Sequence, residues 1–336
     1  MKLDAMILGA PLAEVAGLAA AAEVGGYDGW FTGETAHEPL LACTAAGVAT
    51  ERLQVGTAIA VAFPRSPMHV AQAAHDLQAL TGGRFVLGLG SQVKAHVEKR
   101  FSATWSAPAA RMRDFVLALR AIWSAWETGD RLAYRGEFYR HTLMTPFFTP
   151  PAHGHGPPPV WLAAVGRRMT EVAGEVADGV LCHGFTTDRY LREVTLPALG
   201  AGAEGAGRRR DDVEVALPVF AVTGHDELEV ARADAFVRQQ LAFYGSTPAY
   251  RPVLELHGWG HLHEELHTRS LRGEWDAMPE LVDDEVLHAF AVVAPPDGLG
   301  AAIRARYGDL ADRVSLYTPF QPSAEDVAHL AAGLRR

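Results

Sequence analysis

The sequence predicts a (β/α)8 barrel, the TIM-barrel fold, with insertions. Short apolar segments alternate with helical segments along the chain, which is typical of parallel strands covered on both faces by helices. The strand–helix unit repeats every 25 to 30 residues or so, and eight units need about 250 residues, which leaves about 90 for insertions. A doubly wound open sheet would need a glycine-rich fingerprint after the first strand, and Gly9-Ala10-Pro11 is not one.

The first half of the chain contains four expected strands, each followed by a helix. Gly25-Gly26 ends the first helix, Pro67 begins the third, and Thr81-Gly82-Gly83 ends it. The expected strands are residues 3–8, 30–32, 53–61 and 84–90. The expected helices are residues 12–24, 40–50, 67–80 and 109–126.

The second half repeats the pattern with more interruptions. The four remaining strands are expected at residues 160–164, 179–182, 213–222 and 313–317. Residues 131–140 alternate like a hairpin, and residues 201–210 are expected to form a surface loop. Two insertions, about 128–158 and 245–275, interrupt an expected single domain over residues 1–336.

Composition and charge narrow the function classes. Hydrophobic residues make up 49% and charged residues 21%, an ordinary globular composition. The net charge of −10 argues against nucleic-acid and membrane-surface partners, which need a positive field. Cys43 and Cys182 cannot build a disulfide framework. With no signal peptide and no long apolar run, we expect a cytoplasmic protein.

In a barrel, chemistry is expected where strands end and loops begin. Glu34 follows the second strand directly and His37 lies three residues on, so the two could act as an acid/base pair. A helix cap or a solvated loop is the alternative. Gly9, Phe63, Trp105 and His183 are expected around the mouth as a substrate pocket, with core packing as the alternative for Trp105.

Small residues and glycines mark three further strand ends. The run from Gly56 to Ala60 would let a flat ligand approach the backbone, although tight barrel packing explains it equally well. Free N–H groups at the helix start beside Arg167 and Arg168 favour phosphate, with a plain strand–helix turn as the alternative. The candidate cofactor-binding residues are Thr57, Ala58, Ile59, Gly88, Gly90, Ser91, Gln92, Ala163, Ala164, Val165, Gly166 and Arg167.

A histidine-rich segment matches a zinc-protease pattern. His263 and His267 lie four residues apart with Glu264 beside the first. A zinc site of this kind needs a long buried helix that faces a third ligand, and Gly273 truncates the segment. We therefore expect no metal here, and we expect both side chains to reach solvent or another subunit.

Three glycine-rich segments together resemble the bacterial-luciferase-like superfamily. They are Gly26-Tyr27-Asp28-Gly29-Trp30-Phe31-Thr32-Gly33-Glu34, Gly56-Thr57-Ala58-Ile59 and Leu80-Thr81-Gly82-Gly83-Arg84-Phe85-Val86-Leu87-Gly88-Leu89-Gly90. Within that superfamily the chain looks most like the branch that uses coenzyme F420, a 5-deazaflavin. The resemblance implies a deazaflavin at the barrel mouth, hydride transfer at its C5, and a cis peptide bond between Ala58 and Ile59. Many relatives carry Asp-His where this chain has Glu34-Thr35.

The expected function is therefore hydride transfer between F420 and a small organic substrate, by a homodimer. An FMN-dependent monooxygenase on the same barrel is the main alternative, a zinc hydrolase built on His263 and His267 is less favoured, and a non-catalytic binding barrel comes last. Because the F420 tail is anionic and the protein is negative overall, local cations must bind the tail. We expect Arg167 and Arg65 to serve that purpose.

Overall fold

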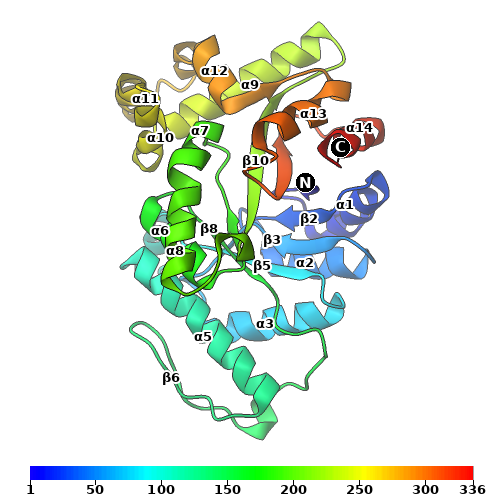
Figure 1. The fold of residues 1–336 in the computed structure, drawn as a ribbon, viewed down its shortest axis with the longest axis vertical. Helices are drawn as coiled ribbons and strands as arrows, with labels where there is room; N and C mark the ends of the chain where they lie inside the picture. The colour runs from blue at the N-terminus through cyan, green and yellow to red at the C-terminus, as the bar shows by residue number, and fades with distance from the viewer. Residues whose placement is uncertain (336) are drawn as a thin grey trace.

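The computed structural model describes residues 1–335 and forms a closed barrel of parallel strands (Figure 1). The barrel closes because β10 pairs with both β9 and β12, and β12 pairs with β1. The predicted (β/α)8 fold is confirmed. The eight barrel strands are β1 (Lys2–Met6), β2 (Gly29–Thr32), β3 (Gln54–Thr57), β5 (Phe85–Gly90), β8 (Val160–Ala163), β9 (Gly179–Leu181), β10 (Glu214–Val222) and β12 (Arg313–Tyr317).

The third strand is broken, which the sequence prediction of one strand over residues 53–61 missed. β3 ends at Thr57, and a separate short strand, β4 (Ala60–Val61), resumes the pairing with β5. Between them lies a cis peptide bond joining Ala58 and Ile59, as the family resemblance implied. The interruption places these two residues at the mouth of the barrel.

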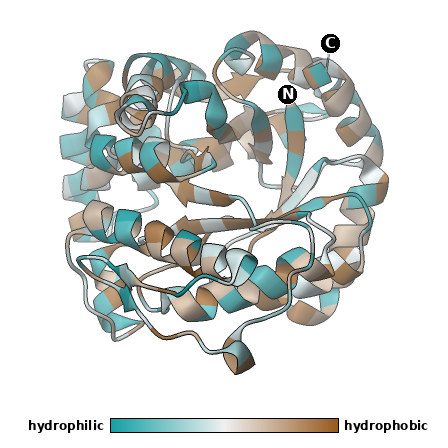
Figure 2. Ribbon diagram, turned by 60° about the horizontal axis from the view of Figure 1, so that its bottom comes forward, coloured by the Kyte–Doolittle hydropathy of each residue, from teal (hydrophilic) through white to brown (hydrophobic). Residues whose placement is uncertain are grey.

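Helices cover the outer face of the strands (Figure 2). Buried apolar side chains of the strands and helices form one large core cluster. Ser66 accepts a hydrogen bond from the Met68 N–H at the start of α3, which Pro67 opens as predicted. The helices around the barrel are α1 (Leu12–Gly25), α2 (Pro39–Val48), α3 (Pro67–Leu80), α4 (Lys94–Lys99), α5 (Pro108–Thr128), α6 (Arg167–Val176), α7 (Asp188–Tyr190), α8 (Leu196–Gly205), α13 (Pro296–Tyr307) and α14 (Ala324–Arg335). A π-helical turn over Leu191–Thr195 joins α7 to α8. The predicted surface loop at 201–210 is half wrong, because α8 continues to Gly205.

A second apolar cluster lies at one end of the molecule, where Figure 1 shows helices gathered beyond the tip of β10. Val237, Leu254, Leu266 and Phe290 pack together there with Val222 of β10. The helices are α9 (Glu227–Gly245), α10 (Arg251–Leu256), α11 (Gly260–Arg272) and α12 (Asp284–Phe290), and the short strand β11 (Ala291–Val293) pairs with β10. Most of the predicted insertion at 245–275 is therefore helical.

The other predicted insertion contains the expected hairpin. Its two short antiparallel strands, β6 (Tyr134–Arg135) and β7 (Arg140–His141), lie at the end of the molecule opposite α9 (Figure 1). None of the helices over residues 1–335 is long and apolar enough to cross a membrane.

The inside of the barrel holds a buried ion pair beneath a layer of rings. The guanidinium of Arg313 is fully buried, and its Nε and Nη2 donate to the Asp4 carboxylate at 2.6 and 2.5 Å. Its charge also lies 5.2 Å from the centre of the Phe31 ring and 5.0 Å from that of Trp161. The pair ties the first barrel strand to the last.

Candidate active site

The floor of the barrel mouth is apolar. Parallel strands place all their carboxyl ends on one rim, so the predicted residues after β2, β3, β5, β8 and β9 share that rim. The cluster below the rim contains residues from six of the strands and the β3–β4 break: Met6, Phe31, Ala58, Val86, Trp161, Leu181 and Ala216. Any molecule in the mouth therefore rests on a surface that includes Ala58 and Leu181.

Glu34, a predicted catalytic residue, is held in an ion-pair clamp. Its Oε2 accepts hydrogen bonds from the Val61 N–H and from Nη1 of Arg65, both at 2.7 Å. The other guanidinium nitrogen of Arg65 donates to Glu38 at 2.8 Å, and the Glu34 N–H donates to the Ile59 carbonyl at 2.8 Å. The clamp thus fixes both ends of the segment from Ile59 to Val61.

The clamp changes the interpretation of Arg65. Two carboxylates, from Glu34 and Glu38, already surround its guanidinium, and only 18% of the Arg65 side chain is exposed. Arg65, which we expected to bind an anionic tail, is thus already paired with two carboxylates, and its binding of a tail stays a prediction. His37, the other predicted catalytic residue, is exposed in the loop that leads into α2.

Two of the predicted cofactor residues serve the close contact between β3 and β5. The Thr57 hydroxyl donates to the Gly88 carbonyl at 2.6 Å and accepts from the Gly88 N–H at 2.9 Å. A Cβ on Gly88 would lie 1.8 Å from the Thr57 carbonyl oxygen, so only glycine fits there. Beyond them, the Ile59 side chain lies against Gly90, whose Cβ would come within 2.8 Å of it.

The remaining predicted cofactor residues follow the ends of β5 and β8. Gln92 has a positive φ of 59°, and its side chain accepts from the Val93 N–H, while the Ser91 hydroxyl donates to the Gln92 carbonyl. Ala163, Ala164 and Val165 lead into Gly166, the N-cap of α6.

Space is open at the amino end of α6. A Cβ on Gly166 would meet nothing within 4 Å, and no side chain caps the helix. Arg167 and Arg168 are both exposed, and both lie near Glu171, at 2.9 and 3.5 Å. One positive charge remains in excess beside the helix end, and the helix dipole adds to it.

Two residues predicted for the substrate pocket are packed rather than open. Phe63 is 3% exposed, with the Trp105 ring edge-on at 5.7 Å and the Arg111 guanidinium 4.5 Å from its centre. Trp105 itself is half-buried, and Gly9 is exposed at a positive φ after β1. Phe63 therefore packs between the Trp105 ring and the Arg111 guanidinium.

His183, the remaining predicted pocket residue, belongs to an aromatic wall that sequence reasoning missed. Its ring stacks on Tyr250 with centres 4.6 Å apart, and Tyr244 meets it edge-on at the same distance. The Tyr244 and Tyr317 hydroxyls lie 2.8 Å apart, and the Tyr317 hydroxyl also donates to Gln240. We call His183, Tyr244, Tyr250 and Tyr317 the aromatic wall. Tyr317 is the last residue of the eighth barrel strand. This strand-end position was the one feature of the sequence that could have indicated the aromatic wall.

The histidine-rich segment has a structural role. The Nδ1–H groups of His263 and His267, one turn apart on α11, donate to the carbonyls of Gly245 and Ser246 at 2.7 and 2.9 Å. Those carbonyls end α9, where no helical partner remains for them. The expectation that both side chains would reach solvent or another subunit is wrong: His263 is 4% exposed and His267 is half-buried.

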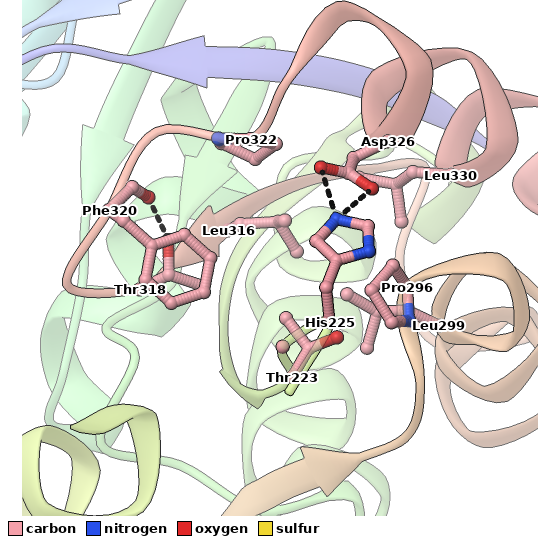
Figure 3. Close-up of a pocket in the computed structure, with 11 residues that line it drawn as sticks. Thr223, His225, Pro296, Leu299, Leu316, Thr318, Phe320, Pro322, Asp326 and Leu330 are labelled. Carbon is pink, nitrogen blue, oxygen red and sulfur yellow. Dashed lines mark hydrogen bonds and ion pairs between the residues drawn. The ribbon is translucent and has the colours of Figure 1, made fainter. Parts of the chain in front are cut away.

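A separate small cavity lies between the ends of β10 and β12 and the first turns of α13 and α14 (Figure 3). His225 Nε2 meets the Asp326 carboxylate there at 3.1 Å, above Leu316 and Leu299. The hydrogen bond to Asp326 raises the pKa of His225. Burial raises the pKa of Asp326, but hydrogen bonds from Ser323 and His225 outweigh it and lower that pKa. The volume of this cavity is about 20 Å³, enough for a single water.

Comparison with known proteins agrees with this architecture. A family model described as luciferase-like monooxygenase matches residues 2–313. An uncharacterized protein of Mycobacterium tuberculosis (strain ATCC 25618 / H37Rv) is 52% identical over 94% of this chain and 92% of its own length. The 5,10-methylenetetrahydromethanopterin reductase of Archaeoglobus fulgidus is 28% identical over 82% of this chain and 80% of its own.

A solved structure has the same fold. The coenzyme F420-dependent tetrahydromethanopterin reductase from Methanopyrus kandleri superposes with a TM-score of 0.78 at 21% identity, covering 98% of this chain and 96% of that one. The family match over nearly the whole barrel, together with the closed (β/α)8 fold, settles the relationship. The chain belongs to the luciferase-like monooxygenase family of enzymes.

Proposed function

We propose that this protein transfers a hydride between coenzyme F420 and a small organic substrate. The observation that carries the proposal is the open amino end of α6 on the rim of an apolar-floored mouth, which fits a flat ring with an anionic tail. The F420-dependent reductase that shares the fold supports the choice of F420, and the A. fulgidus relative is also named a reductase.

The residues of the mouth fit the two parts of such a cofactor. Ala58, Ile59 and Gly90 present small or apolar groups against which a flat ring could lie. Gly166 leaves room for a phosphodiester to approach the first N–H groups of α6, with Arg167 and Arg168 beside it. A cofactor bound in this way would lie across the β3–β8 side of the mouth.

When bound, the deazaflavin would supply the atom that gives or accepts the hydride. The protein would hold the ring and the substrate at reacting distance and exclude water. Glu34 and Arg65 would keep the Ile59–Val61 segment in place through the hydrogen bonds described above. The aromatic wall would face the substrate from the β9–β12 side.

A titration of the purified protein with F420 and, separately, with FMN tests this proposal. We expect F420 to bind, seen as a change in its fluorescence, and FMN to bind far more weakly. Tight FMN binding with no response to F420 would instead favour a flavin-dependent monooxygenase on the same barrel.

A further inference from the structure

His183 lies at the mouth of the barrel, just after the carboxyl end of β9. Gly179 and Leu181 of β9 point into the barrel, toward Trp161 and Gly88, and alternate residues of a strand point the same way. His183 comes two residues after Leu181, which shares the floor cluster with Ala58. β9 itself ends at Leu181, so His183 lies on the rim of the mouth, where its ring packs against Tyr244 and Tyr250.

Hydrogen bonding fixes which nitrogen of His183 carries the proton. The Phe185 N–H donates to Nδ1 of His183 at 3.0 Å, so Nδ1 must be unprotonated and the proton of the neutral ring lies on Nε2. Burial lowers the pKa of His183 to about 4, so the ring is neutral near pH 7. The local structure thus builds a neutral Nε2–H donor.

The rings that pack on His183 belong to Tyr244 and Tyr250. Burial is the cause that lowers the pKa of His183. The Tyr244 and Tyr317 hydroxyls bond to each other, and burial raises the pKa of Tyr250 to about 12, so it also stays neutral. Among the hydrogen bonds formed within residues 1–335, none uses Nε2 of His183.

We propose that Nε2–H of His183 binds the reacting oxygen of a neutral carbonyl substrate, or of the matching alcohol in the reverse direction. This inference rests on the proposed hydride transfer. The hydride would add to the carbonyl carbon, the π electrons would move to the oxygen, and the oxygen would take a proton from water while His183 donates its hydrogen bond. A neutral imidazole is suited to polarising a carbonyl in this way.

The uncharged wall also favours this substrate class over others. A carboxylate or phosphate substrate would need a cation to offset the loss of hydration, and the aromatic wall provides none. The faces of Tyr244 and Tyr250 suit an apolar body attached to one oxygen acceptor.

Carbonyl-labelled [13C]cyclohexanone is the probe for the test, with methylenecyclohexane, which has the same shape but no oxygen, as the ligand control. Wild-type protein, His183→Phe and His183→Gln are titrated with and without F420, and the 13C shift of the carbonyl is followed by NMR. In the wild type we expect the carbonyl resonance to move downfield on binding. His183→Phe should weaken binding about tenfold and abolish the shift, whereas His183→Gln, which restores an N–H, should recover part of both.

The outcomes separate the two proposals. An equal downfield shift in His183→Phe, or no cyclohexanone binding to the wild type, would overturn the role of His183. Methylenecyclohexane binding to the wild type as tightly as cyclohexanone would also overturn the role of His183. If F420 fails to bind but the His183-dependent shift is present, the cofactor is wrong and the oxygen site stands. A far-UV circular dichroism spectrum equal to that of the wild type shows that both variants are folded.

Discussion

At the scale of single residues, Glu34 illustrates how a strand-end position can be found from sequence while its partners cannot. Its place directly after β2 follows from the pattern of the chain, but the arginine that meets it lies 31 residues further on. Nothing in the spacing predicts that Arg65 would turn back to Glu34 and Glu38 instead of facing a ligand. Long-range side-chain partners depend on packing that periodicity does not encode.

The Glu34–Arg65 clamp predicts a coupled effect on stability. Glu34→Gln and Arg65→Met should each lower the free energy of unfolding by about 1–3 kcal/mol, because each leaves a part-buried group without its charged partner. The double variant should cost clearly less than the sum of the two. Urea denaturation measures the free energy of unfolding of the two single variants and the double variant. Glu38→Gln is the control, and we expect a smaller loss because the Glu38 side chain is more exposed. Additive losses would mean that the two residues act independently.

At the scale of elements, the regular strands and helices of the barrel were predictable, whereas the interruptions were not. The sequence predicts one apolar strand over residues 53–61, because small residues are compatible both with a continuous strand and with the interruption between β3 and β4. The helices α10 and α11 were hidden by polar, glycine-punctuated sequence, since their support comes from α9 rather than from a long apolar stripe. The secondary structure of these segments depends on tertiary contacts that the local sequence pattern does not show.

The amino end of α6 gives a prediction with a matched control. Arg167→Ala should weaken F420 binding about fivefold at low salt, with less effect as salt rises, because most of this side chain is exposed. Arg189→Ala is the control: it removes the same charge from the same kind of ion pair, Nε to a glutamate four residues on at 2.9 Å, far from α6 in sequence. Equal affinities for both variants would place the tail elsewhere.

At the scale of the whole molecule, closure of the barrel concentrates its most buried charges at one seam. Asp4→Asn should lower the free energy of unfolding by about 3–5 kcal/mol, because it leaves the fully buried Arg313 without its main countercharge. Arg192→Ala, which breaks an exposed 2.7 Å pair with Asp309, should cost at most about 1 kcal/mol. Chemical denaturation followed by circular dichroism compares the two. Similar small losses would show that the seam does not depend on this pair.

The two histidine caps at the end of α9 have a consequence for how the enzyme could diversify. Tyr244 immediately precedes Gly245, whose carbonyl accepts a hydrogen bond from His263, and Tyr250 belongs to the 245–275 segment, so this segment supports two of the four rings of the aromatic wall. The rim proposed for the cofactor is built from short connections in the first half of the chain. In the proposed arrangement, residues 245–275 and the cofactor rim would therefore occupy separate stretches of the sequence. Exchange of residues 245–275 between relatives would then change the substrate pocket and leave the residues proposed for the cofactor unchanged.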